Sequence, residues 1–330
     1  MTTKEPLLRV VNLQKFFPAR RAGFFGHSRG TIQAVNKVSF TLNAGETLGI
    51  VGESGCGKST LGRTIMGLYK PSGGKVFFRH KDLGSLAGAE QIAMRRHYQM
   101  IFQDPYASLN PRMNIYDIIA EPLRTHRLAA SPFELSLKIR ELMDRVGLPA
   151  TMARRHPHEF SGGQRQRIAI ARAIAIKPSL IICDEPVSAL DVSIQAQIIN
   201  LLQELQRELG VAYVFISHDI GVVRHVSHRI LVMYLGGVME QAATEQLFTA
   251  AAHPYTQALL SAVPLPDPRR ERQRQRIILR GDLPSSLNPP KACLFQSRCP
   301  HAFEPCGKTP PPLDTITPGH TFACHLPHSR

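Results

Sequence analysis

The sequence predicts an α/β protein, in which helices cover a sheet over residues 1–253 and a tail of different character occupies residues 254–330. Two observations predict this architecture. Short apolar runs alternate with segments of helical periodicity, and a glycine-rich loop directly follows one of those runs. Beyond His253 the helical periodicity fades and proline becomes frequent, so we expect a separate C-terminal region.

Each apolar run is short enough to be a buried strand. The four runs are "TLGIV" (47–51), "SLIIC" (179–183), "YVFIS" (213–217) and "RILVMYL" (229–235). Between them, residues 131–147 predict a helix that Ser131 caps, that Pro132 begins, that Glu134 completes as a capping box and that Gly147 ends. A second helix runs from Ile194 to Leu209, and its apolar stripe predicts a core contact.

The chain is strongly basic, with 40 Lys and Arg against 25 Asp and Glu, a net charge of +15 and a pI near 9.9. Such a balance indicates an anionic partner, which charge alone leaves open between nucleotide, nucleic acid and an acidic membrane surface. The run "RRERQRQR" (269–276) fits a nucleic-acid arm or a solvated linker, and the interleaved Gln favours the linker. No apolar run has the length of a membrane span and the N-terminus lacks the layout of a signal peptide, so we expect a cytosolic chain.

The stretch "GESGCGKST" (52–60) fits the phosphate-binding pattern G-x-x-x-x-G-K-[ST] and follows an apolar strand. In such a loop successive backbone N–H groups face a phosphate, and the following helix directs its positive end the same way. Lys58 is predicted to neutralise the β- and γ-phosphates, and the Ser59 hydroxyl to ligate Mg²⁺. An ordinary tight turn is the alternative, which the strand–loop–helix context disfavours.

The stretch "LIICDEP" supplies the acids that nucleotide hydrolysis needs. Its apolar residues predict a buried strand that ends in Asp184 and Glu185, at the edge where parallel sheets bind ligands. Asp184 is predicted to hold Mg²⁺, directly or through water, and Glu185 to orient and polarise the attacking water. A pair of acids that merely caps the helix after Pro186 is the alternative reading.

The stretch "FSGGQ" (160–164) predicts a second anion site. Ser161, Gly162 and Gly163 open a helix and leave N–H groups for an anion. The chain has one complete phosphate loop but two helix ends of this kind. The second helix end is therefore predicted to contact a nucleotide held by another subunit, which implies a dimer. His218 and Gln103 each follow an apolar run. Alone, neither residue indicates a site, and each becomes a candidate only together with the motifs above.

Taken together, these motifs resemble the ATP-binding subunit of an ABC transporter. "GESGCGKST" is similar to the Walker A motif, "LIICDE" to Walker B, "FSGGQ" to the signature, "FQDP" to the Q-loop, "SALD" (188–191) to the D-loop and "SHD" to the switch histidine. The resemblance implies ATP and Mg²⁺ as cofactors. It implies as nucleotide-binding residues Phe17, Gly52, Glu53, Ser54, Gly55, Cys56, Gly57, Lys58, Ser59, Thr60, Ser161, Gly162, Gly163, Gln164 and Asp191, with Phe16 as the alternative ring for adenine. It implies as catalytic residues Glu185, His218 and Gln103, and as Mg²⁺ ligands Ser59, Gln103 and Asp184.

The tail narrows the resemblance to ATPases of dipeptide and oligopeptide importers, on "HPYTQALLSAVP" and "LPSSLNPPKACLFQSRCPHAFEPC" together with "FQDPYASLNPR" and "DEPVSALDVS". The implied fold is a RecA-like P-loop core with an N-terminal antiparallel β subdomain, a helical signature subdomain at about 90–170 and a Pro- and Cys-rich extension. The implied partners are a second ABC ATPase, commonly a paralogue bound head to tail, two membrane permease subunits and an extracytoplasmic substrate-binding protein. The implied place is the cytoplasmic face of the inner membrane, as a peripheral subunit.

Four cysteines cluster in the tail, and in a reducing compartment such a cluster suggests metal more than disulfide. They are Cys293, Cys299, Cys306 and Cys324. In similar proteins such an arrangement is associated with a 4Fe–4S cluster, and four thiolates suit iron–sulfur or zinc. Standard zinc and ferredoxin spacings are both absent. The resemblance favours iron–sulfur over zinc, and reduced thiols packed in the tail stay open as the alternative.

The function that this resemblance implies is uptake of peptides driven by ATP hydrolysis. Alternatives are the same ATPase role for nickel, glutathione, sugars or antimicrobial peptides, since the chain holds no substrate-selecting part. A soluble ABC ATPase that acts on nucleic acid or ribosomes is disfavoured because the chain has one cassette and no long coiled-coil insertion. A non-hydrolysing regulatory subunit is disfavoured because Glu185 and the signature are intact.

Overall fold

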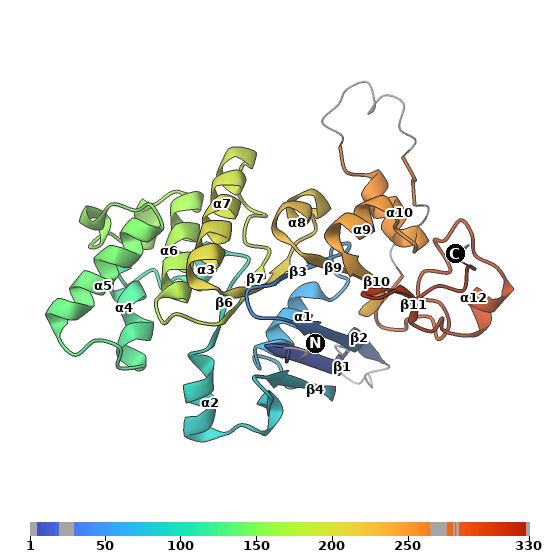
Figure 1. Cartoon of the computed structure of the whole chain (residues 1–330), viewed down its shortest axis with the longest axis horizontal. Coiled ribbons are helices and arrows are strands. Elements are labelled where there is room, and N and C mark those ends of the chain that lie inside the picture. Colours follow the sequence, from blue (N-terminus) through green and yellow to red (C-terminus); the bar gives the residue numbers. More distant parts are fainter. Residues whose placement is uncertain (1–4, 20–29, 265–275, 280, 282–283, 328–330) are drawn as a thin grey trace, which may run out of the picture. The chain divides into compact units, whose positions relative to one another are not determined.

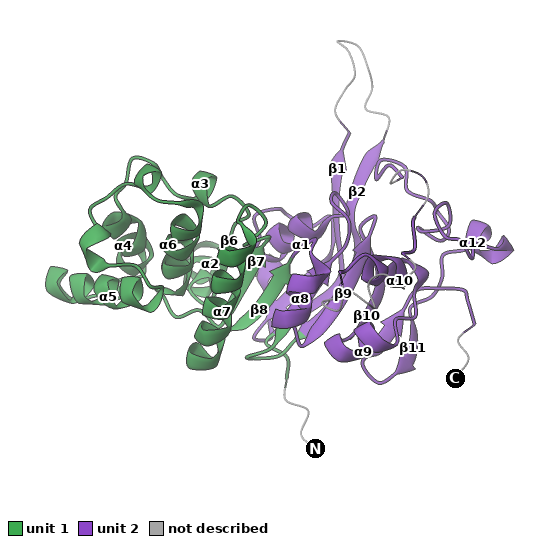
Figure 2. Ribbon diagram, turned by 90° about the horizontal axis from the view of Figure 1, so that it is seen from above, with its two compact units in different colours: residues 1–7, 42–47, 85–216 green, residues 8–41, 48–84, 217–330 purple. Residues whose placement is uncertain are grey.

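The computed structural model describes residues 5–19, 30–264, 276–279, 281 and 284–327. The chain divides into two compact units that alternate along the sequence (Figure 2). Unit 1 comprises residues 1–7, 42–47 and 85–216, and unit 2 comprises residues 8–41, 48–84 and 217–330. Across the described ranges, no helix is both long enough and apolar enough to cross a membrane.

Unit 1 combines three parallel strands with a group of helices. The strands β6 (Tyr98–Ile101), β7 (Leu180–Asp184) and β8 (Ala212–Ile216) lie in the order β8-β7-β6. The helices are α2 (Gly88–Arg95), α3 (Pro105–Ser108), α4 (Ile115–Thr125), α5 (Pro132–Arg145), α6 (Gly162–Ile174) and α7 (Val192–Leu209). Figure 1 shows α4, α5 and α6 side by side, which gives the unit a helical part between β6 and β7.

The helix α5 forms where its local signals predict it. The Ser131 Oγ accepts the Glu134 N–H at 3.1 Å, Pro132 lies in the first turn, and Gly147 follows with φ +70°. The predicted capping box is wrong in one respect, because the Glu134 carboxylate accepts the N–H of Ala130 instead of that of Ser131. The apolar face is buried through Leu135, Ile139 and Met143, as the spacing predicts.

Unit 2 contains two sheets. In the first, the strands β1 (Leu8–Pro18), β2 (Thr31–Leu42), β4 (Gly73–Phe78) and β5 (Lys81–Asp82) lie in the order β2-β1-β4-β5, with β1 and β4 antiparallel. In the second, the order is β11-β12-β10-β9-β3, from β3 (Thr47–Val51), β9 (Arg229–Tyr234), β10 (Gly237–Ala243), β11 (Asp314–Thr317) and β12 (His320–Phe322). The helices are α1 (Lys58–Ile65), α8 (Ile220–Val226), α9 (Thr244–Thr249), α10 (Pro254–Ser261) and α12 (Glu304–Lys308).

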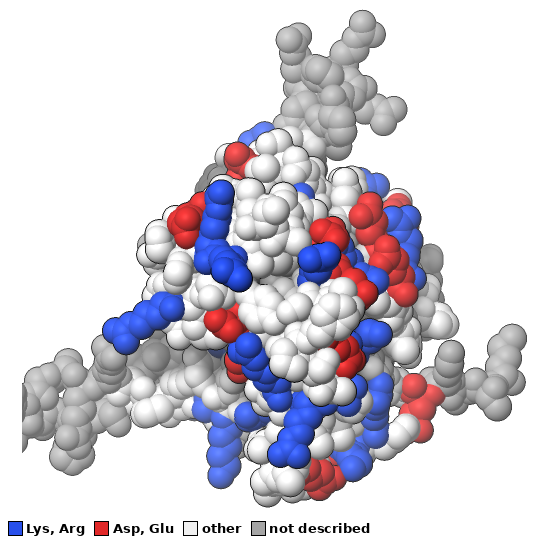
Figure 3. Space-filling model, turned by 90° about the vertical axis from the view of Figure 1, so that its left-hand side faces the viewer, with Lys and Arg blue, Asp and Glu red and all other residues white. Residues whose placement is uncertain are grey.

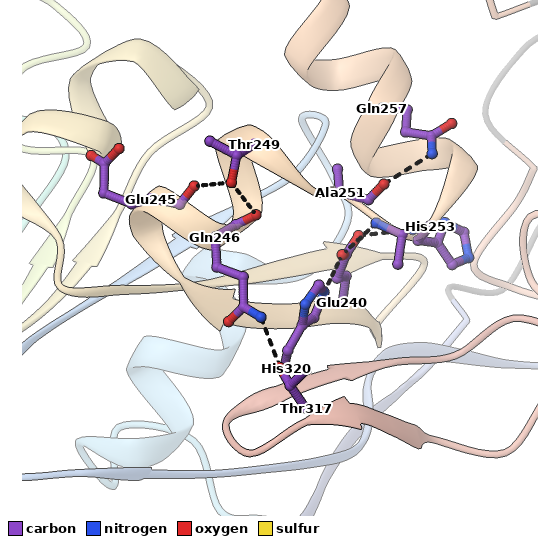
Figure 4. Close-up of polar contacts among 10 residues, drawn as sticks. Glu240, Glu245, Gln246, Thr249, Ala251, His253, Gln257, Thr317 and His320 are labelled. Atoms are coloured by element: carbon purple, nitrogen blue, oxygen red, sulfur yellow. Dashed lines mark hydrogen bonds and ion pairs between the residues drawn. The ribbon is translucent and has the colours of Figure 1, made fainter. Parts of the chain in front are cut away.

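The tail is built into unit 2, because the hairpin β11–β12 extends the second sheet. Strand β12 pairs antiparallel with β10, with Glu240 opposite Phe322. The Glu240 carboxylate is fully buried and accepts three hydrogen bonds, from the N–H of Ala252 (2.7 Å), the N–H of His253 (2.9 Å) and His320 Nε2 (2.7 Å) (Figure 4). A buried carboxylate needs such compensation, so this contact fixes the tail to the strand.

The fold class is confirmed: a mixed α/β protein with an antiparallel N-terminal sheet and parallel strands. The four predicted strands are present, with β7 at 180–184 and β8 at 212–216, each one residue from the predicted start. The interpretation of the run 269–276 lies outside the described residues except for Arg276. The division at residues 253 and 254 stays a prediction.

We predict that Glu240→Ala lowers the free energy of unfolding by about 3–5 kcal/mol, because two buried N–H groups and His320 lose their acceptor. Urea denaturation of the full chain measures it. The matched control is Glu245→Ala, which removes an exposed carboxylate at 3.8 Å from Arg224 in the same region and should change stability by less than about 0.5 kcal/mol. Equal stability of the two variants would contradict the anchoring role of Glu240.

Candidate nucleotide-binding and catalytic site

The Walker A loop joins two regular elements of unit 2. Strand β3 is buried along its whole length, and α1 begins at Lys58 with no side-chain cap on its first N–H groups. Gly52, Gly55 and Gly57 have φ of +155°, +80° and +105°. A Cβ on Gly57 would lie 1.9 Å from the carbonyl oxygen of Ala34, so only glycine lets the backbone pass here.

The Lys58 side chain spans the loop from inside. It is 4% exposed, and its Nζ donates to the carbonyl oxygens of Gly52 (2.8 Å) and Glu53 (3.0 Å). Ser59 and Thr60 follow in the first turn of α1 and are half-buried. A positive charge and uncapped N–H groups therefore meet at one helix end, which is the arrangement that binds a phosphate.

The remaining loop residues differ in environment. Ser54 and Gly55 are exposed, whereas Cys56 is buried, and burial raises the pKa of its thiol. The Glu53 N–H donates to the Tyr255 hydroxyl at 3.0 Å, and the Glu53 carboxylate pairs with Arg298. The sequence motif did not reveal these two partners, because they come from distant parts of the chain.

In unit 1, the structure brings Gln103 and Glu185 together. Strands β6 and β7 are parallel, with Ile101 opposite Cys183, so the residues that follow them meet at one edge of the sheet. The Gln103 Nε2 donates to Glu185 Oε2 at 2.9 Å. This contact links the Q-loop directly to the carboxylate that the sequence assigns to water activation.

Glu185 has a constrained backbone beside a buried carboxylate. Its φ of +47° is left-handed, and its N–H donates to the Ile216 carbonyl at 3.0 Å. Such strain in a residue other than glycine is typical of functional sites. Asp184, at the end of β7, is fully buried. Burial raises the pKa of the neighbouring Cys183, and the charge of Asp184 raises it further by a smaller amount.

The signature loop opens α6 in unit 1 through a reciprocal cap. The Gln164 N–H donates to Ser161 Oγ at 3.3 Å, and the Ser161 N–H donates to Gln164 Oε1 at 3.0 Å. The prediction that Ser161, Gly162 and Gly163 leave their N–H groups for an anion is therefore wrong for the N–H of Ser161, and the N–H of Gln164 is engaged as well. A Cβ on Gly163 would lie 2.5 Å from Ile194 Cγ2, so this glycine also lets α6 pack on α7.

The other predicted residues are placed as follows. Asp191 caps α7, with the Ile194 N–H at 3.3 Å from its Oδ1, and Gly162 is exposed in the first turn of α6. In unit 2, His218 is exposed just before Asp219, the cap of α8.

Phe17 in unit 2 lies in an aromatic pair with Tyr69. The ring centroids are 5.3 Å apart, and Lys15 Nζ lies 4.7 Å from the Phe17 centroid. Tyr69 was missed from the sequence, where it is a lone aromatic after α1. Its contact with Phe17 makes Tyr69 a further candidate for an adenine-stacking surface.

The predicted iron–sulfur cluster finds no support in the structure. Within the described ranges, no three His, Cys, Asp or Glu side chains form a group that could hold a metal ion. All six cysteines are free thiols. Burial, followed by the charges of the other three tail cysteines, raises the pKa of Cys293 to about 11.

The chemistry of the donors that the two units carry fits Mg²⁺ and a triphosphate. Ser59, Gln103 and Asp184 offer hydroxyl, amide and carboxylate oxygens, which are the ligands of Mg²⁺ in proteins. Lys58 and the start of α1 offer positive charge to phosphate, and Glu185 offers a carboxylate to water. Each unit therefore carries donors of the kind that suit one part of nucleoside triphosphate binding and hydrolysis.

We predict that Gly57→Ala weakens MgATP binding at least about 100-fold, because its Cβ would overlap the Ala34 carbonyl and displace the loop. The matched control is Gly55→Ala, whose Cβ meets nothing within 4 Å and which adds only left-handed strain, so its loss should not exceed about tenfold. Calorimetric titration of the full chain with MgATP compares them. Similar affinities for the two variants would mean that the loop does not need this close approach.

Comparison with known proteins identifies the family of the chain. The ABC transporter family model matches residues 35–188, and the model for the C-terminal region of oligopeptide/dipeptide transporters matches residues 239–306. The oligopeptide transport ATP-binding protein AppF of Bacillus subtilis is 52% identical over 324 residues, 98% of each chain. The oligopeptide transport ATP-binding protein OppF of Escherichia coli is 51% identical over 312 residues, 94% of this chain and 93% of its own length.

Solved structures lead to the same family. A dimeric post-hydrolysis structure of the ATP-binding cassette MJ0796, bound to ADP and Pi, has a TM-score of 0.63 and 31% identity, over 72% of this chain and 98% of that chain. CbiO1 of Clostridium perfringens, part of an ABC transporter complex, has a TM-score of 0.63 and 26% identity, over 75% of this chain and 92% of that chain. With its Walker, Q-loop and signature residues in place, the chain belongs to the ATP-binding proteins of ABC transporters.

Proposed function

We propose that the chain is the ATP-hydrolysing subunit of an ABC importer that takes up di- and oligopeptides. The observation that carries this proposal is a complete set of ATPase residues in a chain about half identical, over nearly its full length, to oligopeptide transport ATP-binding proteins. The extension from residue 254, proposed as a separate functional region, overlaps the match to the peptide-transporter C-terminal model, which covers residues 239–306.

In the proposed reaction, Lys58 and the N–H groups at the start of α1 hold the β- and γ-phosphates of ATP, and Phe17 or Phe16 stacks on adenine. Glu185 orients and polarises the attacking water, and His218 stabilises the charge that develops on the γ-phosphate. Mg²⁺, when bound by Ser59, Gln103 and Asp184, neutralises phosphate charge. The Gln103–Glu185 hydrogen bond supports the assignment, because it places the Q-loop amide at the carboxylate that must meet water.

The proposed assembly places each ATP between the Walker A loop of one ATPase and Ser161, Gly162, Gly163, Gln164 and Asp191 of another, which is commonly a paralogue. The dimeric cassette structure with ADP and Pi supports a dimer. Two permease subunits and an extracytoplasmic binding protein complete the importer, with this subunit at the cytoplasmic face of the membrane. Nickel, glutathione, sugars and antimicrobial peptides are the alternative cargoes, and the relatives' names favour peptides.

A role on nucleic acid is the second candidate, suggested by the net charge of +15. The face shown in Figure 3 argues against it, because Lys and Arg side chains there are interspersed with Asp and Glu. Unit 1 contains ion pairs of this kind, between Arg124 and Asp117 (2.9 Å) and between Arg145 and Glu208 (3.2 Å). A mixed surface attracts a polyanion less than a basic stripe does.

The iron–sulfur cluster remains a prediction that the ATPase role does not need. Protein purified under argon tests it directly. Brown protein with iron and sulfide would restore the cluster, and colourless protein without iron or zinc would leave the four tail thiols with a structural role.

We predict that Glu185→Gln lowers ATP turnover at least about 100-fold while MgATP still binds, because the amide cannot polarise water and the phosphate contacts are unchanged. Phosphate release by the assembled complex and MgATP titration measure the two properties. The control is Glu208→Gln, which changes an exposed carboxylate on α7 and should leave turnover unchanged. Unchanged turnover in Glu185→Gln would exclude Glu185 as the group that activates water.

A further inference from the structure

The Walker A loop is attached to the cysteine-rich tail by an ion pair. The Arg298 Nη1 donates to both carboxylate oxygens of Glu53, at 3.0 Å to Oε1 and 2.8 Å to Oε2. The Arg298 side chain is 10% exposed and that of Glu53 is 28% exposed. A charge-assisted contact that is largely shielded from water is far stronger than an exposed surface pair.

The backbone of Arg298 is held by a well-packed part of the tail. The Arg298 backbone N–H donates to the carbonyl of Phe295 at 3.1 Å, in the turn that begins at Cys293. Phe295 is 1% exposed and packs on Tyr234 at the end of β9 and on Tyr255 in α10, with ring centroids 5.4 Å apart in both pairs. This aromatic cluster, Tyr234, Tyr255 and Phe295, fixes the backbone from which Arg298 extends.

The aromatic cluster also contacts Glu53 directly, through Tyr255. The Tyr255 hydroxyl oxygen accepts the Glu53 N–H at 3.0 Å, and burial raises the pKa of Tyr255, which keeps the hydroxyl protonated. The Glu53 carbonyl accepts from Lys58 Nζ at 3.0 Å. Amide, carboxylate and carbonyl of this one residue are therefore all engaged by groups of the protein.

Two consequences follow for the loop. First, the N–H of Glu53 is committed to Tyr255, so Glu53 acts as the anchor of the loop and the phosphate contacts fall to the residues after it. Second, the Glu53 carbonyl helps to aim Lys58, so displacement of Glu53 would also displace the ammonium group that meets the phosphates.

We propose that Arg298 is a positioning residue of the ATP site: through Glu53 it holds the Walker A loop in the conformation that binds the phosphates of ATP. The tail then contributes directly to nucleotide affinity in addition to the stability of unit 2. The inference rests on the proposed ATPase function, and it assigns a role to a residue outside all six sequence motifs.

The test is MgATP binding by the full chain, with a fluorescent ATP analogue as the probe and ATP as the competitor. Arg298→Ala should raise the Kd about tenfold, because the loop must then be ordered when the nucleotide binds. Arg298→Lys keeps a charge without the guanidinium geometry, so its Kd should lie between those of the unsubstituted chain and Arg298→Ala. In the assembled complex, Arg298→Ala should raise the KM for ATP by a similar factor and change kcat less than about twofold.

A double-mutant cycle separates positioning from general weakening of the fold. Glu53→Ala should raise the Kd about as much as Arg298→Ala, and the double variant no more than either alone, because both changes break one contact. The matched control is Lys308→Ala, which removes an exposed ion pair with Glu304 in the same tail and should leave the Kd unchanged.

The outcomes decide the proposal. An unchanged Kd in Arg298→Ala, or additive effects in the double variant, would overturn it while leaving the ATPase function intact. Should Arg298→Ala fail to fold, the comparison of Arg298→Lys with Glu53→Gln serves in its place, and an unchanged Kd in both would overturn the proposal. Failure of the unsubstituted chain to bind ATP would instead overturn the proposed function.

Discussion

The structure depends on a backbone constraint: the loop between β3 and α1 must turn its N–H groups toward an anion and still pass close to its neighbours. Only glycine meets both demands at Gly52 and Gly57, where a Cβ would lie 2.2 Å from the Met233 carbonyl and 1.9 Å from the Ala34 carbonyl. The buried strand β3 fixes where the loop starts, and the first turn of α1 fixes where it ends. The placement of Lys58 follows from these two boundaries.

The tail is part of the same constraint, although its sequence looks like a separate region. Strand β12 pairs with β10, and the buried Glu240 carboxylate joins β12 to the segment before α10 through His320 and two backbone N–H groups. That segment leads to Tyr255, whose hydroxyl meets Glu53 in the Walker A loop. Hydrogen bonds and a short stretch of chain therefore connect the C-terminal hairpin to the phosphate loop within unit 2.

The fold and the motifs of the candidate site could be predicted because their signals are local, and the roles of the motif residues stay predictions. Apolar runs marked β3 and β9 to within a residue, and Ser131 with Pro132 marked the start of α5, since caps and strand burial depend on neighbours in sequence. Contacts between distant residues carry no such signal, so Arg298, Tyr255 and Tyr69 were missed. The iron–sulfur prediction depended on the resemblance and on four cysteines close in the sequence, and neither says whether the four thiols converge on one point.

In the proposed assembly, one chain supplies only half of each working ATP site. The decisive measurement is ATP turnover by the purified chain, alone and in the complex with its partner ATPase and permease subunits. We expect substantial phosphate release in the complex and very little from the isolated subunit at low concentration. Full turnover by a lone monomer, or none in the assembled complex, would rule out a shared ATP site.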